Sequence, residues 1–97
     1  MADIDITRED TETKGRYVYR PEGGEEAELT FSKVSDTRII VDHTGVPDSL
    51  RGQGIGKALS LRAVEDARTH GVTIIPLCPF FKAQAQRHLD WQDVVEL

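Results

Sequence analysis

The first part of the chain alternates short apolar runs with polar turns, a pattern typical of β-strands. Ile4 and Ile6, followed by a polar stretch, indicate a first strand at an edge of a sheet. The aromatic and β-branched residues at 16–20 indicate a second strand, and the Pro- and Gly-containing segment 21–24 indicates the turn that ends it. These positions predict two strands separated by polar segments.

Two further strands are predicted before residue 47. Ala27, Leu29 and Phe31 alternate with polar neighbours, which predicts a strand with one face on the core and the other toward solvent. Residues 38–41 are apolar on both faces, as in a central strand, and the run continues toward Val46. Because the links between the four strands are short, they predict an antiparallel meander.

The apolar positions then change from the period of a strand to that of a helix. One stripe at helical spacing is formed by Ile55, Leu59, Ala63 and Ala67. Gly71 ends this helix, residues 72–75 indicate a short buried strand, and residues 80–89 indicate a second helix, whereas residues 90–95 show no clear period. The predicted fold class is α+β, with the order β-β-β-β-α-β-α. The aromatic residues expected in the core or at an interface are Phe80, Phe81 and Trp91.

Size and charge narrow the functional classes. A chain of 97 residues holds one core, so residues 1–97 are expected to form a single domain. The net charge of -5 argues against a phosphate-tracking surface, so nucleic acid is not expected as a partner. No apolar run approaches the roughly 20 residues that span a bilayer, and residues 1–5 are acidic, which predicts a cytoplasmic protein without a membrane partner. The single cysteine can form neither an internal disulfide nor, alone, a metal site, so no metal is expected.

A glycine-rich segment stands between the fourth predicted strand and the first predicted helix. Gly52, Gly54 and Gly56 allow the backbone to approach a ligand closely, and the free N–H groups at the helix start point toward it. Arg51 and Lys57 flank these glycines, and the first turns of the helix contain no acidic residue, although helix starts usually favour acids. A bound anion would remove this conflict. The alternative is a turn whose glycines serve only the backbone.

Two other glycine-loop motifs do not fit. A P-loop needs a longer spacing and a hydroxyl residue after its lysine, whereas Ala58 follows Lys57. A dinucleotide-binding loop belongs to a parallel βαβ unit that opens the fold, whereas the strands before residue 52 have links too short for parallel crossovers.

Residues 51–56 resemble the Arg/Gln-x-x-Gly-x-Gly/Ala signature of the GNAT superfamily of acetyl-coenzyme A dependent N-acetyltransferases. More narrowly, this loop resembles the small GNAT-like proteins of the N-acetyltransferase domain-containing 1 type. Four other parts of the chain resemble the same small proteins: residues 42–47, residues 78–82, His88 and residues 91–95. The resemblance covers most of the chain. It implies a truncated GNAT fold, because the chain has no room for the helices that usually follow the first strand.

The resemblance also implies acetyl-coenzyme A (acetyl-CoA) as cosubstrate, with its pyrophosphate bound by the loop backbone. The implied cofactor-binding residues are Val46, Arg51, Gly52, Gln53, Gly54, Ile55, Gly56 and Lys57. The acceptor would be an amine-bearing small molecule or protein, and a homodimer could complete its site. The alternative function is a regulatory module that binds acetyl-CoA or CoA without turnover. A purely structural protein would leave the basic helix start unexplained.

Cys78 and His43 are the candidate catalytic residues, and the resemblance links both with the active site. Cys78 precedes Pro79 at the predicted start of the second helix, where the helix end favours a thiolate, although a free cysteine often packs as a small apolar residue. His43 is expected on the face of its strand that Val41 occupies, as a general base for the amine or for Cys78, or as a structural residue. Relatives often carry Glu where this chain has Gly45. Transfer either passes through an acetyl-cysteine or occurs by direct attack of the amine.

Overall fold

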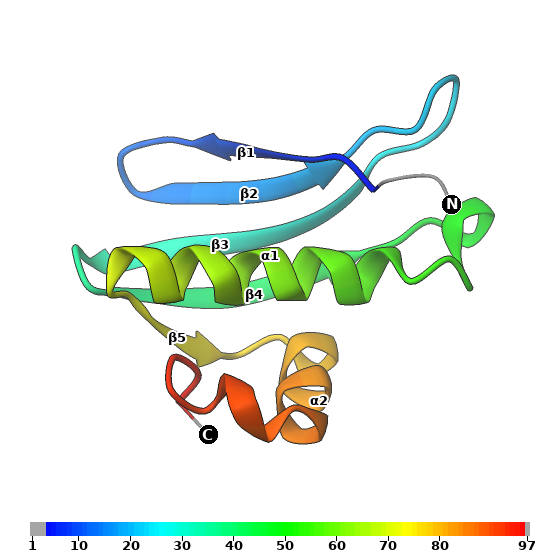
Figure 1. Cartoon of the computed structure of the whole chain (residues 1–97). Coiled ribbons are helices and arrows are strands. Elements are labelled where there is room, and N and C mark those ends of the chain that lie inside the picture. Colours follow the sequence, from blue (N-terminus) through cyan, green and yellow to red (C-terminus); the bar gives the residue numbers. More distant parts are fainter. Residues whose placement is uncertain (1–3, 97) are drawn as a thin grey trace.

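The computed structural model describes residues 4–96, which form a five-stranded sheet and two α-helices (Figure 1). In chain order the elements are β1 (Ile6–Asp10), β2 (Lys14–Tyr19), β3 (Ala27–Ser35), β4 (Arg38–Gly45), α1 (Ile55–His70), β5 (Thr73–Pro76) and α2 (Pro79–Arg87). The predicted α+β class and the predicted order of elements are confirmed. Residues 1–3 and 97 lie outside the described residues. The prediction of a single domain over residues 1–97 and the acidic segment 1–5 both include some of these residues.

The strands lie in the sheet in the order of the sequence. β1 to β4 form the predicted antiparallel meander, and α1 carries the chain across so that β5 pairs with β4 in parallel. This parallel ladder joins β5 to residues 38–41 of β4, whereas β4 continues to Gly45. The two strands therefore separate beyond Val41. At this point the Cys78 N–H donates a hydrogen bond to the Val41 carbonyl (2.9 Å).

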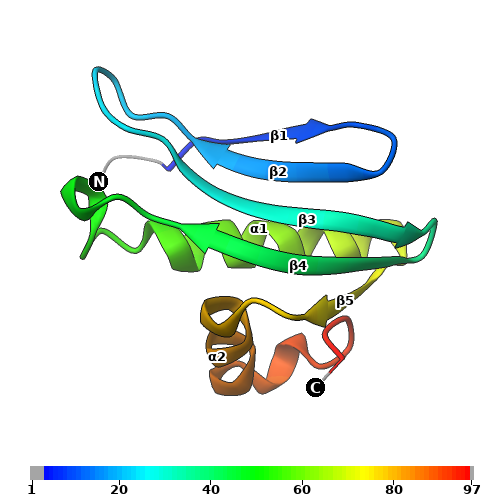
Figure 2. The ribbon, with the colours of Figure 1, turned by 180° about the vertical axis from the view of Figure 1, so that it is seen from behind.

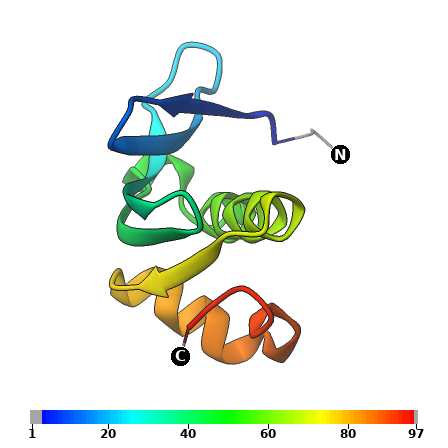
Figure 3. The same cartoon turned by 90° about the vertical axis from the view of Figure 1, so that its left-hand side faces the viewer.

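α1 packs along one face of the sheet and closes the hydrophobic core (Figure 3). The apolar stripe predicted from the sequence is the buried side of this helix. On the sheet it meets the buried side chains of Tyr17, Leu29, Phe31 and Val41. The Tyr17 hydroxyl also donates a hydrogen bond to the Asp66 carboxylate (2.9 Å), which ties α1 to β2. Figure 2 looks onto the other face of the sheet, which α1 does not cover and which we call the uncovered face.

α2 and the residues after it pack at the β5 edge of the sheet (Figure 1). Phe81 is 0% exposed and stacks on Trp91, so both aromatic residues lie in the core as predicted. The segment without a clear period forms a short 3₁₀ helix, Leu89–Trp91, and then a parallel bridge between Val95 and Ile74. Among the described residues, neither helix has the length and apolar character that crossing a membrane requires.

A β-bulge in β4 changes which of its residues face the core. Phe31 of β3 pairs with Val41, but the next pair joins Thr30 to His43, so Asp42 is an extra residue. The Asp42 carboxylate accepts a hydrogen bond from the Thr30 hydroxyl on the uncovered face. His43, which pairs with Thr30, faces the same way, and the prediction that it shares the face of Val41 is wrong. Simple alternation along a strand fails wherever one residue is inserted.

Candidate functional site

The connection from β4 to α1 is a loop held by one buried side chain and two glycines. Leu50 is 7% exposed and anchors a short 3₁₀ helix, Asp48–Leu50, in the core. Gly52 and Gly54 have φ values of 80° and 75°, a left-handed conformation that costs other residues energy. Gly54 is also the N-cap of α1, so the loop leads directly into the helix start.

A pocket of about 470 Å³, which we call the loop pocket, lies against this connection. Its lining residues are Thr44, Val46, Leu50, Arg51, Gly52, Gly54, Gly56 and Phe80. The pocket therefore contains Val46, Arg51 and the three glycines of the predicted cofactor set. The end of β4 and the starts of α1 and α2 converge on this one cavity.

The other predicted cofactor residues lie outside this lining. Ile55 is 2% exposed and belongs to the hydrophobic core. The Gln53 side chain donates a hydrogen bond to the Ser49 carbonyl (3.4 Å), and Lys57 is exposed on the first turn of α1. For Ile55 and Lys57, the group offered to a ligand is the backbone N–H, because the first N–H groups of a helix have no carbonyl partner within it.

The loop is less basic than its sequence suggested. Arg51 Nε lies 3.0 Å from Asp48 Oδ1, and the two side chains are 74% and 91% exposed. An ion pair this exposed contributes little to stability, so an incoming anion can replace Asp48 as the partner of Arg51. The first turn of α1 carries no acidic residue, and its N-terminus therefore remains favourable for negative charge.

Sequence reasoning missed three residues of the loop pocket: Thr44, Leu50 and Phe80. Thr44 pairs with the buried Leu29 after the bulge, so it faces the helix side of the sheet. Phe80 is 38% exposed, so it lies outside the core, and of the predicted alternatives, core or interface, only an interface position remains a prediction. The sequence did contain a sign that only one of these two phenylalanines would be buried. Phe80 and Phe81 are adjacent in a predicted helix, where neighbouring side chains point in different directions.

Cys78 lies where β4 and β5 separate, and it is the N-cap of α2 as predicted. It is 3% exposed, and its thiol donates a hydrogen bond to the Thr44 hydroxyl (Sγ–Oγ1 3.4 Å). Because Thr44 lines the loop pocket, the thiol lies directly behind one side chain of the pocket wall. Thr44 therefore stands between the pocket and the thiol.

His43 is exposed on the uncovered face, whereas Thr44 and Cys78 meet on the helix side of β4. The strand therefore lies between the imidazole and the thiol. An ideal Cβ at Gly45 would lie 3.1 Å from His43 Nε2, so any side chain at residue 45 would crowd the imidazole. Glycine at this position leaves the His43 ring accessible from the uncovered face.

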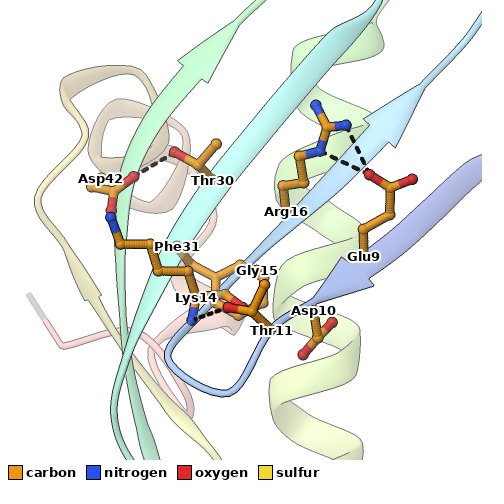
Figure 4. A pocket seen from close by; sticks show the side chains of 9 residues that line it. All are labelled: Glu9, Asp10, Thr11, Lys14, Gly15, Arg16, Thr30, Phe31 and Asp42. Atoms are coloured by element: carbon orange, nitrogen blue, oxygen red, sulfur yellow. Dashed lines mark hydrogen bonds and ion pairs between the residues drawn. The ribbon is translucent and has the colours of Figure 1, made fainter.

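The uncovered face carries two further hollows. One, of about 450 Å³, lies across β1 to β4 and is lined in part by Lys14, Thr30 and Asp42 (Figure 4). The other, of about 430 Å³, lies at the end of β4. It is lined by Arg16, Glu25, Glu26, Glu28, Gly45, Val46 and Pro47. Val46 lines both this second hollow and the loop pocket.

Comparisons with known proteins show the family and the fold of the chain. Residues 16–94 match the sequence profile of the family described as GCN5-related N-acetyl-transferase. The fold is similar to the NMR solution structure of a GCN5-like protein from Staphylococcus aureus. The two share 36% sequence identity and a TM-score of 0.72, over 99% of this chain and 91% of that one. A search of curated proteins gave no match. Since the matched residues run from β2 through α2 and include the glycine loop, this chain belongs to the GCN5-related N-acetyltransferases.

Proposed function

We propose that this protein binds acetyl-CoA in the loop pocket and transfers the acetyl group to an amine. One observation carries the proposal: the glycine loop, the end of β4 and the starts of α1 and α2 meet at a single cavity. Helix starts and glycine backbones favour phosphates, while Val46, Leu50 and Phe80 offer apolar surface. Coenzyme A has both chemistries, a pyrophosphate and a less polar arm that ends in a thiol.

The loop backbone would hold the pyrophosphate. Gly52 and Gly54 have open space where a Cβ would stand, so a phosphate can come close to the main chain there. Arg51 adds a cationic side chain whose exposed ion pair with Asp48 an anion can replace. The membership of the chain in the family supports this assignment, since the loop lies within the matched residues.

When bound, acetyl-CoA supplies an acetyl group that is activated as a thioester. The gap between β4 and β5 is suited to orient such a group, because residues 42–45 extend past the parallel ladder. Their backbone N–H and C=O groups on that edge are available to hydrogen-bond a ligand. An acceptor that approaches along the uncovered face would come to Val46, which lines both cavities.

His43 and Cys78 have separate roles in this proposal. His43, which is exposed on the uncovered face, would take the proton that an attacking amine loses there. Cys78, hydrogen-bonded to Thr44, is placed beside the opposite wall, where it can protonate a departing thiolate or pack against it. Because β4 lies between them, His43 is poorly placed to deprotonate Cys78. This favours direct attack by the amine over a route through an acetyl-cysteine.

The acceptor is proposed to be a cationic amine. The hollow at the end of β4 is lined by Glu25, Glu26, Glu28 and Arg16. Arg16 pairs with Glu26 and Glu28, and Arg20 pairs with Glu26, so the negative charge near the hollow comes from Glu25 and from the net charge of -5 of the whole chain. A negative field of this kind concentrates amines such as lysine side chains or polyamines near the surface.

A module that binds the coenzyme without turnover is the second candidate. The uncovered face favours it, because an acceptor beside His43 would stay open to water on that side (Figure 2).

Two measurements test the proposal. Calorimetric titration with acetyl-CoA and with CoA measures binding, and an assay of free thiol with a panel of amine and acidic acceptors measures turnover. We expect binding of both coenzymes and thiol release with lysine-like or polyamine-like acceptors at low salt. Binding without thiol release for every acceptor would support the second candidate, and absence of binding would contradict both. Faster turnover with acidic acceptors would contradict the proposed acceptor class.

A further inference from the structure

Phe80 is an exposed aromatic residue next to a fully buried one. Phe81 is 0% exposed and stacks on Trp91, with ring centroids 6.3 Å apart, which fixes the start of α2 on the core. Phe80 is 38% exposed and lines the loop pocket. Because its neighbour anchors the backbone, the Phe80 ring is held at the pocket without being buried in the core. It is therefore available to contact a ligand.

Gly56 is a glycine whose backbone does not require glycine. It is the second residue of α1, and it is not among the glycines with positive φ, which include Gly52 and Gly54. Glycine in a helix is unfavourable relative to alanine, so another reason must account for it. An ideal Cβ on Gly56 would lie 2.6, 3.0 and 3.3 Å from three ring carbons of Phe80. Gly56 thus makes room for the Phe80 ring.

The lining of the loop pocket combines two chemically different parts. The backbone of Gly52 and Gly54 with the Arg51 side chain is suited to phosphate. Phe80, whose ring lies against Gly56, forms with Val46 and Leu50 a part suited to a less polar group. A ligand that contacts both parts needs a phosphate joined to an extended, weakly polar arm.

We propose that Phe80 is a specificity-determining residue, which selects ligands with a pantetheine arm over phosphorylated nucleotides that lack one, and that Gly56 seats its ring. This inference rests on the proposed function. The Phe80 ring packs against the arm, whereas the loop backbone contacts the phosphates. Loss of the ring therefore lowers the affinity for the arm and leaves the contribution of the phosphates unchanged.

The first test compares CoA with 3′-phosphoadenosine 5′-diphosphate, which shares its nucleotide and lacks the arm. Calorimetry would measure both affinities for the wild type, for Phe80→Ala and for the control Leu77→Ala, an apolar residue that is 66% exposed and outside the pocket. We expect Phe80→Ala to weaken CoA binding by about tenfold and to change the affinity for the armless nucleotide by less than about twofold. Leu77→Ala should change neither.

The second test introduces Gly56→Ala into the wild type and into Phe80→Ala, with circular dichroism to confirm folding. An added methyl displaces the ring in the wild type, so CoA affinity should fall there and should stay unchanged in the Phe80→Ala background. Equal losses in both backgrounds would show that Gly56 serves the phosphates and would overturn the inference. Wild-type CoA affinity in Phe80→Ala would also overturn it while leaving the proposed function intact. A wild-type protein that binds no CoA would contradict the proposed function itself.

Discussion

The Cys78 thiol donates a hydrogen bond to the Thr44 hydroxyl, 3.4 Å away, on the pocket side of β4. The bulge at Asp42 produces this relationship, because the extra residue turns Thr44 toward the helix side and His43 away from it. With regular alternation from Val41, His43 would have occupied the side of the thiol instead. One inserted residue thus separates the two candidate catalytic side chains and gives Cys78 a hydroxyl partner in place of an imidazole.

For Cys78, we expect the serine variant to keep acetyl transfer within about tenfold of the wild type, because serine can donate the same hydrogen bond to Thr44. Cys78→Ala should bind the coenzyme normally. Mass spectrometry after rapid quenching of protein incubated with acetyl-CoA and no acceptor should show no acetyl group on Cys78. A trapped acetyl-Cys78, together with loss of turnover by several orders of magnitude in Cys78→Ala, would establish the covalent route.

His43→Ala should lower kcat about a hundredfold, since removal of a general base typically has an effect of this size or larger. Coenzyme affinity should be unchanged, because the imidazole lies on the uncovered face and not in the loop pocket. His70→Ala, at the far end of α1, is a matched control that should alter neither quantity. Steady-state kinetics and calorimetry check both expectations. An unchanged kcat in His43→Ala would remove His43 from the reaction.

Asp10 makes the stability of the fold depend on pH in the acid range. The hydrogen bond from Arg8, reinforced by Lys33, lowers the pKa of Asp10 from 3.8 to about 2. Because the pKa is depressed in the folded state, the ionised carboxylate stabilises that state fully above about pH 4, and this contribution is lost as the pH falls toward about 2. We expect Asp10→Asn to flatten this part of the stability curve, measured by denaturant unfolding across the acid range. A variant curve as steep as that of the wild type would refute the assignment.

Helices and strands could be predicted from the sequence where the apolar residues recur with one clear spacing. The stripe from Ile55 to Ala67 identifies α1, because a helix buries one side and repeats it every three or four residues. Gly71 ends this helix as predicted, with a φ of 68° and its N–H on the Ala67 carbonyl. The glycine loop was also recognisable, since its glycines and charges stand between a strand and a helix. These features depend only on local sequence.

The details of the candidate site depend on irregularities that local sequence does not encode. The bulge at Asp42 moves His43 to the other face, and no periodic pattern shows where a strand gains a residue. Gly54 and Gly56 have the same side chain, yet the first needs a left-handed backbone and the second needs space for Phe80. The partner of Gly56 is distant in sequence, so only the packing of α2 against α1 identifies its role.

The location of the coenzyme site is tested most directly by comparing Gly54→Ala with Gly71→Ala. Both glycines have left-handed φ values, 75° and 68°, and open space where a Cβ would stand. Both substitutions should therefore cost about 1 kcal/mol of stability through backbone strain. Gly54 lines the loop pocket at the start of α1, whereas Gly71 caps its other end. Calorimetric titration with acetyl-CoA should show about tenfold weaker binding for Gly54→Ala and wild-type binding for Gly71→Ala. Wild-type affinity in both folded variants would contradict the binding of acetyl-CoA at this loop.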